Sequence, residues 1–432
     1  MQLVAYGAQD IYLTGQPQIT FFKSVYRRHT NFAIESIQQT INGSVAPGAR
    51  VSVTISRNGD LLKNLWIQYN PALLVPAGGS TMLASDLSHS LLQILEIEIG
   101  GQLIDRHYGM WLTVWRDLSE LNSTGSQGEI TAGGAEPSIN GTVPASTRYS
   151  RMAYTHQGGA ATSTVSAPSE AYIPMRFWFC KNPGLAIPLI ALQYHEVKFN
   201  IQFALTAFSM YSSGTAVNNL ASANVAVYAD YVYLDTTERR QFAQNAHEYL
   251  IDQLQTQQEG SSGTTTANTI RLNFNHPVKE LIWVGQATTL TSSSSVDEVA
   301  GGATPSSIIN LAPGGSPVSG TAVPAAVSGL QTKIILNGTD RFTARNIKYF
   351  TRNQVWDCHT GFGATAVPDS IAVYSFALRP EEHQPSGTCN FSRIDTAQLW
   401  FQGDYVNALN IYAVNYNVLR IMSGMGGLAY SN

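Results

Sequence analysis

Stretches in which apolar and polar residues alternate recur along most of this chain. Residues 195–203 alternate almost without interruption, and residues 51–56 carry valine or isoleucine at every second position. Leu95, Ile97 and Ile99 likewise alternate with two glutamates. Side chains of a β-strand point to opposite faces in turn, so a period of two predicts strands that bury one face. The chain is therefore expected to consist mainly of β-sheets.

Helical spacing is confined to a few short segments. Residues 108–121 place Trp111, Leu112, Trp115 and Leu118 three or four positions apart, which predicts a helix with an apolar side. A second candidate covers residues 235–242, where threonines, a glutamate and two arginines supply capping chemistry.

A Pro/Gly-rich stretch at residues 385–395 leads directly into an alternating pattern. Proline restricts the backbone angle φ to a narrow range, and glycine allows a wide range. This stretch therefore predicts a tight loop followed by a strand at 391–402. Arg393 and Asp395 would share one face of that strand and form an ion-pair network. We interpret them as residues that fix strand register at an interface, because no catalytic pattern surrounds them. The residues of this structural motif are Pro385, Ser386, Gly387, Asn390, Arg393 and Asp395.

The pattern of the first half of the chain returns in the second half. A short aromatic strand, a Pro/Gly loop and an alternating strand follow one another at residues 175–203 and again at 373–402. The isoleucine-rich strand and glycine turn at 95–101 are echoed at 334–338. Repeats of this length indicate two copies of one domain, because solenoid repeats are shorter.

This repeat suggests a division of the chain into four parts. Residues 1–32 precede the first alternating strand and form an N-terminal arm. Residues 33–236 form a first β-sandwich and residues 248–432 a second one. The charged segment at 237–247 is expected to be a linker helix between them.

The arm contains a compact basic cluster beside aromatic residues. If this part is helical, Phe22 and Tyr26 lie together at a spacing of four, and Lys23 and Arg27 lie together next to them, followed by Arg28. An apolar stripe beside a basic one suits an anchor on the inner side of an assembly, against other proteins or an anionic membrane. A solvated helix face is the simpler alternative.

The composition narrows the class of protein further. Charged residues make up only 12% of the 432 residues, and the formal net charge is −4, which argues against a protein that coats nucleic acid through a basic face. The three cysteines are far apart and indicate neither a zinc site nor a disulfide framework. No signal peptide and no membrane-spanning helix are expected.

No residue pattern rises to a catalytic, cofactor-binding or metal-binding site. His195 and Glu196 are adjacent in a strand and point apart, without a second histidine at zincin spacing. Cys358 and His359 are neighbours in sequence, which is usually incidental for a nucleophile and its base. The glycines at 424–427 lack the strand-to-helix context of a phosphate-binding loop. We therefore expect no enzyme and no cofactor.

Long stretches of the sequence resemble the major capsid proteins of large icosahedral DNA viruses, the nucleocytoplasmic large DNA viruses, most closely those of chlorella viruses. The arm, the turn after the first strands, the motif at 385–395 and the C-terminal segment all take part. The matching residues are 3–10, 17–23, 25–28, 55–61, 183–197, 385–395 and 416–430.

The resemblance implies a fold and a structural function. The family fold is an all-β double jelly roll, two eight-stranded antiparallel sandwiches in tandem with a few short helices. Three copies form a homotrimeric, pseudo-hexagonal capsomer that tiles the icosahedral shell of the virion, assembled in the host cytoplasm. Its implied partners are neighbouring capsomers, minor capsid and vertex proteins and the internal viral membrane, without direct contact to nucleic acid.

The long loops are where the chain departs from the chlorella virus pattern. Residues 123–170, 206–223, 285–329 and 357–369 are not closely similar to it. In the family such loops face outward and carry glycans at sites that are not ordinary sequons. No glycosylated position can be carried over to this sequence.

Three alternatives remain open from the sequence. A minor capsid or vertex-associated double jelly roll of the same virus would share these features. A carbohydrate-binding tandem sandwich would expose Trp or Tyr in one loop, whereas the loops here are rich in Thr, Ser and Gly. A glycosidase would need two carboxylates about 5–10 Å apart, which a sequence does not reveal.

Overall fold

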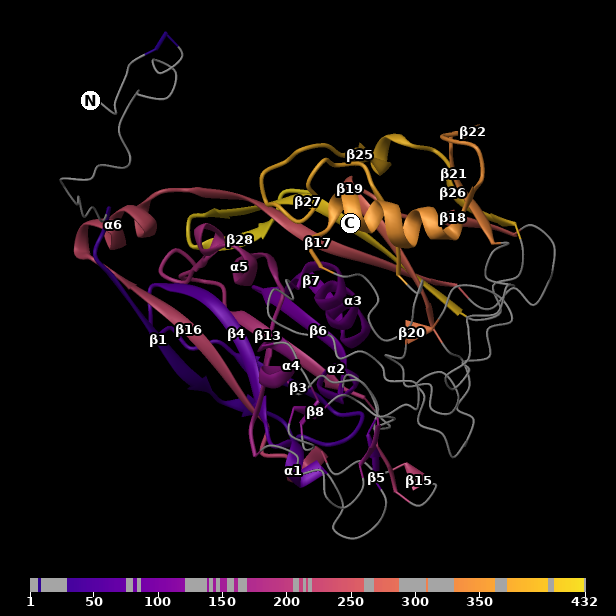
Figure 1. Ribbon diagram of the computed structural model, residues 1–432. Coiled ribbons are helices and arrows are strands. Elements are labelled where there is room, and N and C mark those ends of the chain that lie inside the picture. Colours follow the sequence, from indigo (N-terminus) through magenta and orange to yellow (C-terminus); the bar gives the residue numbers. More distant parts are fainter. Residues whose placement is uncertain are drawn as a thin grey trace, which may run out of the picture.

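The computed structural model consists of two β-sandwiches that lie side by side (Figure 1). Most of each sandwich is described, with loops left out between the strands. The described residues are 29–74, 87–120, 169–204, 220–259, 268–286, 330–361, 371–402 and 408–430, with short pieces at 7–8, 81–83, 138–139, 143–144, 148–153, 159–161, 210–212, 215–216 and 308–309.

The first sandwich packs one antiparallel sheet, in the order β1-β16-β4-β11, against another in the order β3-β13-β6-β7. Alternation decides which side chains enter the core between them: Leu65, Ile67 and Tyr69 of β4 are buried there. The strands are β1 (Phe32–Gln39), β3 (Arg50–Thr54), β4 (Leu61–Tyr69), β6 (Leu92–Ile99), β7 (Gln102–Tyr108), β11 (Ala171–Pro174), β13 (Val197–Phe203) and β16 (Ala226–Leu234).

The second sandwich repeats this arrangement around its own core, which contains Leu281, Trp283 and Phe350. Its sheets have the orders β17-β27-β19, with β24 beyond β19, and β18-β26-β21-β22. The strands are β17 (His247–Glu259), β18 (Asn268–Leu272), β19 (Pro277–Gln286), β21 (Gln331–Leu336), β22 (Thr339–Asp340), β24 (Ile371–Ser375), β26 (Ala397–Gln402) and β27 (Ala408–Met422).

Both sandwiches have the strand order of a jelly roll. When the main strands of each sandwich are counted along the chain, one sheet has the order first-eighth-third-sixth and the other second-seventh-fourth-fifth. Each sheet thus alternates strands from the two halves of its domain, as nested Greek keys require. The predicted double jelly roll is confirmed.

Shorter elements complete the fold. The remaining strands are β2 (Ile41–Asn42), β5 (Thr81–Leu83), β8 (Ser138–Ile139), β9 (Val143–Pro144), β10 (Gly159–Ala161), β12 (Ile187–Pro188), β14 (Met210–Ser212), β15 (Thr215–Ala216), β20 (Ile308–Ile309), β23 (Arg345–Asn346), β25 (Cys389–Asn390) and β28 (Met425–Leu428). The helical elements are α1 (Pro71–Leu74), α2 (Leu87–Ser90), α3 (Gly109–Ser119), α4 (Arg148–Ala153), α5 (Trp178–Lys181), η2 (Pro183–Leu185), η3 (Leu220–Ser222), α6 (Thr236–Gln244), η5 (Tyr349–Asn353), α7 (Gln354–Cys358) and η6 (Phe391–Arg393).

The aromatic segment at 175–179 was expected to be a strand, and that prediction is wrong. Strand β11 ends at Pro174, and α5 begins at Trp178. The carbonyl oxygen of Phe177 accepts hydrogen bonds from the amides of Cys180, at 2.9 Å, and Lys181, at 3.2 Å. These local bonds close a helical turn, so the apolar run is buried without joining a sheet.

Helix α6 lies between the last strand of the first sandwich and the first strand of the second (Figure 1). No residue of this helix is buried. Its Phe242 packs against a small cluster on the first sandwich formed by Leu61, Ala186 and Val232, and Arg239 pairs with Asp60 at 2.9 Å. The helix is therefore held to the first sandwich at its surface.

Helix α3 holds the two sandwiches together. It directly follows β7 and is buried from Gly109 to Leu118. Leu112 enters the core of the first sandwich, whereas Trp111 and Trp115 enter a separate cluster against the second sandwich. A helix with large apolar side chains on two sides is stable only when both sides are covered, and its buried Arg116 and Asp117 pair with each other at 2.7 Å.

The second sandwich receives α3 on the outer face of its β19-β24-β27 sheet. Apolar side chains on that face complete the cluster: Ile282, Val284, Ile371, Val373, Tyr412 and Val414. The rings of Trp111 and Tyr412 lie 5.1 Å apart, and Gly361 donates a 2.7 Å hydrogen bond to the Leu118 carbonyl. A Cβ on Gly361 would lie 2.5 Å from the Leu118 carbonyl carbon, so only glycine permits this approach.

Strand β17 and the last hairpin of the second sandwich make further contacts to the first sandwich. The amide of Leu254 on β17 donates to the Asp105 carboxylate on β7 at 3.1 Å. Gln253 Nε2 donates to the Ile104 carbonyl. The hairpin β27–β28 adds a hydrogen bond from the Gly426 amide to His195 Nδ1 at 3.1 Å. Strand β17 is thus covered along its middle by the first sandwich.

Buried charges lie near this junction and are paired. Lys279 Nζ lies 3.1 Å from Asp252 Oδ2. His359 lies between two carboxylates, 3.0 Å from Glu280 Oε2 and 3.0 Å from Glu381 Oε1. The contact to Glu280 is off the N–H axis, so it is an ion pair rather than an aligned hydrogen bond. A buried charge of this kind is stable only when it is compensated.

Burial alone would lower the pKa of His359, but the negative charges of Glu280 and Glu381 and the hydrogen bond to Glu381 outweigh it and raise the pKa to about 9. The ordinary histidine value is 6.5. Because the pKa is higher in the folded protein, protonated His359 stabilises the fold fully below pH 6.5. That contribution is lost as the pH rises through about 9.

We predict that replacing Trp111 with alanine destabilises the protein by roughly 3–5 kcal/mol, because it leaves a cavity between the sandwiches. Trp111 is 1% exposed. Urea denaturation followed by circular dichroism measures the loss. Tyr430→Ala, at a side chain that is 63% exposed, is the control and should change stability by less than about 0.5 kcal/mol. Equal effects of the two changes would contradict the role of α3.

We also predict that stability falls between pH 6.5 and pH 9.5, by up to about 3 kcal/mol at 1.36 kcal/mol per pKa unit. His359→Gln should be less stable at pH 6.5 and show a flatter profile across this range, because glutamine does not titrate. Urea midpoints measured at half-unit pH steps test this. The control His29→Gln, at an exposed residue, should follow the wild-type profile. An unchanged slope in His359→Gln would refute the assignment.

Candidate functional site

The predicted structural motif at 385–395 closes one end of the second sandwich. The Ser386 hydroxyl accepts a hydrogen bond from the amide of Arg379 at 3.0 Å. Gly387 has a φ of +152°, and a Cβ there would lie 2.7 Å from the Phe376 carbonyl oxygen. Only glycine fits this position without moving the backbone.

The strand predicted at 391–402 begins six residues later than expected. Residues 391–393 form the 3-10 turn η6, and β26 starts at Ala397. Asn390 accepts from the Ser392 amide at 3.0 Å and so caps the turn. The amides of Asp395 and Thr396 donate to the Asn337 side chain at 3.0 and 3.2 Å. These two asparagine side chains thus accept hydrogen bonds from backbone amides that would otherwise be available to pair with a neighbouring strand.

This shift separates the two charged residues of the motif. Arg393 ends the turn η6 and Asp395 follows it, so the prediction that they share one face of a strand is wrong. Both are exposed. Within the described part of the protomer, no ion pair joins them to each other. Their charged groups face away from the core of the sandwich.

Phe391 is the part of the motif that enters the core. It is 3% exposed and packs edge-on against Phe274 and Phe376. Its amide donates to the carbonyl of His276 at 3.0 Å, and β25 pairs with the start of β19. The motif therefore stabilises the second sandwich, while its polar residues lie at the surface.

The predicted inner-face anchor cannot be placed. Phe22, Lys23, Tyr26, Arg27 and Arg28 lie outside the described residues. The described chain resumes at His29, just before the edge strand β1.

The thiols carry no sign of nucleophilic chemistry. Burial raises the pKa of Cys180 to about 12, and burial also raises the pKa values of Cys358 and Cys389. His359, the neighbour of Cys358, is engaged by two carboxylates instead. A thiol with a raised pKa is inert at neutral pH.

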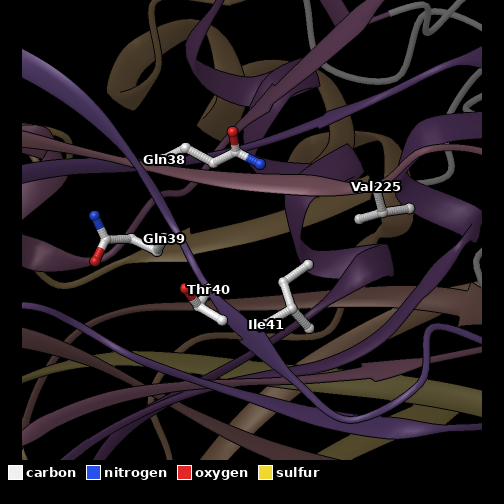
Figure 2. A pocket seen from close by; sticks show the side chains of 5 residues that line it. All are labelled: Gln38, Gln39, Thr40, Ile41 and Val225. Carbon is white, nitrogen blue, oxygen red and sulfur yellow. The ribbon is translucent and has the colours of Figure 1, made fainter.

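Binding sites for small ligands are equally undeveloped in the described part of the chain. It contains no group of three or more His, Cys, Asp or Glu residues placed to hold a metal ion, and none of its helices is long and apolar enough to cross a membrane. A hollow of about 480 Å³ lies where β1 meets β2 (Figure 2). Its lining contains no ionisable group: Gln38, Gln39, Thr40, Ile41 and Val225.

An aromatic platform on the outer face of the first sandwich was missed by the sequence reasoning. It consists of Trp66 on β4, Tyr172 on β11 and Tyr228 on β16. The Trp66 and Tyr228 rings are stacked 4.6 Å apart, and Tyr172 meets Trp66 edge-on at 5.3 Å. The alternating pattern of β4 indicates part of the platform: Leu65 and Ile67 face the core, so Trp66 between them points outward.

Hydrogen bonds fix the orientation of this platform. Trp66 Nε1 donates to Asp230 at 3.2 Å. The Tyr172 hydroxyl donates to Glu170 at 2.5 Å, and this bond is the main reason why the pKa of Tyr172 is raised. The platform lies on strands rather than in a loop, unlike the aromatic cluster expected of a carbohydrate-binding sandwich.

The three platform residues are half-buried, whereas the other sandwich carries largely exposed apolar side chains. Trp356 on α7 is 83% exposed, and Leu378, after β24, is 79% exposed. Exposure of this kind is uncommon for a side chain as large as tryptophan.

Known proteins are similar to this chain along its whole length. Two family models match consecutive parts of the chain. The model of the major capsid protein N-terminus matches residues 20–235, and the model of the large eukaryotic DNA virus major capsid protein matches residues 238–427.

Individual relatives cover the whole chain. The major capsid protein of Pyramimonas orientalis virus is 45% identical over 100% of this chain and 99% of its own length. That of Paramecium bursaria Chlorella virus 1 is 42% identical with the same coverage.

Solved structures agree with the fold. A quasi-atomic model of the PBCV-1 virus capsid matches with a TM-score of 0.73 and 38% identity, over 96% of this chain and 100% of that one. The Faustovirus major capsid protein shares the fold at 12% identity, with a TM-score of 0.61 over 96% of this chain and 94% of its own. With both jelly rolls matched along their length, this chain belongs to the family of major capsid proteins of large eukaryotic DNA viruses.

Proposed function

We propose that this protein, a structural component of the capsid shell and not an enzyme, assembles into homotrimeric capsomers with a pseudo-hexagonal outline. One observation carries the proposal. The protomer contains two sandwiches of the same strand order, joined side by side through a buried helix. Three such protomers in a ring present six similar sandwiches, and six-sided blocks tile a surface without gaps.

The surface of one protomer supports self-association. Strand β1 is exposed along most of its length and forms the edge of its sheet. Phe32 and Ile34 on this strand are 52% and 48% exposed. An unpaired apolar edge promotes association until it is covered, and cyclic closure covers every copy equally.

The exposed charges of the structural motif suit the same surface. The charged groups of Arg393 and Asp395 have no described ion-pair partner in the protomer, and we assign them to contacts with neighbouring subunits. Exposed ion pairs contribute at most about 1 kcal/mol each. Their role is thus to orient the contact more than to strengthen it.

The N-terminal arm supplies the contact to the inner side of the shell. Its aromatic and basic residues, with Tyr26 and Arg27 among them, suit minor capsid and vertex proteins or the anionic internal membrane. The net charge of −4 argues against direct binding of the genome. The Ser- and Thr-rich loops at 123–170 and 285–329 suit an outer surface that carries glycans, after assembly in the host cytoplasm.

A minor capsid or vertex-associated protein of the same family remains the second candidate. The identity of 45% to a relative named major capsid protein, over the full chain, favours the major one. Both roles use the same two-sandwich protomer.

We predict that the purified protein has the mass of three chains, about three times 46.8 kDa. Size-exclusion chromatography with light scattering at micromolar concentration measures this. Asp395→Asn should leave the circular dichroism spectrum unchanged and weaken the trimer by a few-fold at most. A wild-type monomer under native conditions would overturn the capsomer proposal.

We further predict that a protein lacking residues 2–28 still folds and forms trimers but is poorly incorporated into particles. The arm precedes the first strand of either sandwich, so the deletion removes none of the described core residues. Thermal unfolding, oligomer mass and yield of particles are compared with the full chain. Loss of folding would show that the arm belongs to the sandwich, and normal particle yield would show that it anchors nothing.

A further inference from the structure

Each of the two sandwiches contains a helical segment at the same place in its strand order. The segment lies between the fifth and the sixth strand: α3 after β7, and residues 349–358, made of η5 and α7, after β22 and the short strand β23. Each sends one side chain into the core of its own sandwich, Leu112 in the first and Phe350 in the second. The two segments thus occupy equivalent places in the order of the repeat, although α3 packs on β6 and β7 of its own sandwich and the segment 349–358 packs on β24.

Their other sides are buried to different degrees. The rest of α3 is buried against the second sandwich, with Trp111 1% exposed. In the segment 349–358, Val355 joins the cluster around α3, but Trp356 is 83% exposed and Asp357 beside it is exposed as well. The Trp356 side of this segment is therefore covered by no described part of the protomer.

The receiving sheets differ in the same way. In the second sandwich, the outer face of β19-β24-β27 is covered by α3. Its pair Ile282 and Tyr412, cross-strand neighbours on β19 and β27, lies under that helix. In the first sandwich the equivalent pair is Trp66 and Tyr228, cross-strand neighbours on β4 and β16. This pair and Tyr172 form the aromatic platform, which no described segment of the protomer covers as α3 covers its counterpart.

The first strands repeat this asymmetry. Strand β17 is covered in its middle by β7 of the first sandwich. Its counterpart β1 is exposed over most of its length, with Phe32 52% exposed. The sheet face and the first strand that take part in the contact within the protomer thus have counterparts in the first sandwich, on which no described segment packs as α3 and β7 pack on theirs.

We propose that Trp356 of one protomer packs on the aromatic platform of a second copy of this chain, formed by Trp66, Tyr172 and Tyr228. This inference rests on the proposed capsomer and names the contact that closes it. Segment 349–358 then plays between copies the part that α3 plays within each copy. In particular, Trp356 on Tyr228 repeats the contact of Trp111 with Tyr412, whose rings lie 5.1 Å apart.

The chemistry of the two surfaces suits such a contact. Tryptophan and tyrosine bury large areas and dominate the energetics of interfaces. The platform is oriented in advance by the bonds from Trp66 to Asp230 and from Tyr172 to Glu170, so little freedom is lost on binding. The helical patch and the platform lie on different sandwiches, so each copy donates one and accepts one. Such a heterologous contact closes into a ring of three when the rotation between neighbouring copies is 120°.

Cysteine pairing tests the contact directly. One protein carries Trp356→Cys and a second, differently tagged, carries Tyr228→Cys; the two are co-expressed and oxidised. A disulfide that joins the two differently tagged proteins is expected for this mixture. Neither variant alone should form it, and the single variants thus control for the three native thiols. Tyr194→Cys, at an aromatic residue that is 76% exposed and off the platform, replaces Tyr228→Cys as the matched control.

Substitution supplies the second measurement. Trp356→Ala should leave the circular dichroism spectrum unchanged, because the side chain is exposed, and should raise the dissociation constant of the contact about 30-fold, the effect of losing an interface hot spot. Tyr194→Ala should leave it unchanged. A trimeric wild type with no specific disulfide, and with a Trp356→Ala trimer of normal affinity, overturns this contact but leaves the capsomer standing. A monomeric wild type overturns both.

Discussion

The burial of α3 between the two sandwiches is the constraint on which the rest of the structure depends. A helix with tryptophans on one side and leucine on the other has no stable position at the surface of a single jelly roll. Because the second sandwich covers it, the two domains are held as one block. The buried charges around His359 belong to the second sandwich and are compensated within it, so they stabilise the domain that receives the helix rather than the junction itself.

A block of two fixed sandwiches is what a shell requires. Loosely linked domains would adopt many relative orientations, and a lattice contact would have to order them at each addition. Here the orientation is set by the Trp111–Tyr412 contact and by the Asp105–Leu254 hydrogen bond within the chain. The surfaces that remain exposed, around Trp356 and around Trp66, are then presented in a constant geometry.

Much of this architecture could be predicted from the sequence, and the exceptions have local causes. Alternation identified the strands, and the spacing of Trp111 and Trp115 identified α3. The error at 391–402 arose because the side chain of Asn337, far away in sequence, accepts from the amides before β26. The platform was missed because alternation shows that Trp66 points outward, whereas only the folded sheet brings Tyr228 beside it.

The central claim is that the contact within the protomer is repeated between protomers. A single-particle reconstruction of the purified oligomer tests it most directly. We predict a closed ring of six similar sandwiches, with segment 349–358 of each copy lying on the β4-β11-β16 face of the next. A ring in which that face is open to solvent, or an oligomer joined only through its loops, would contradict the account.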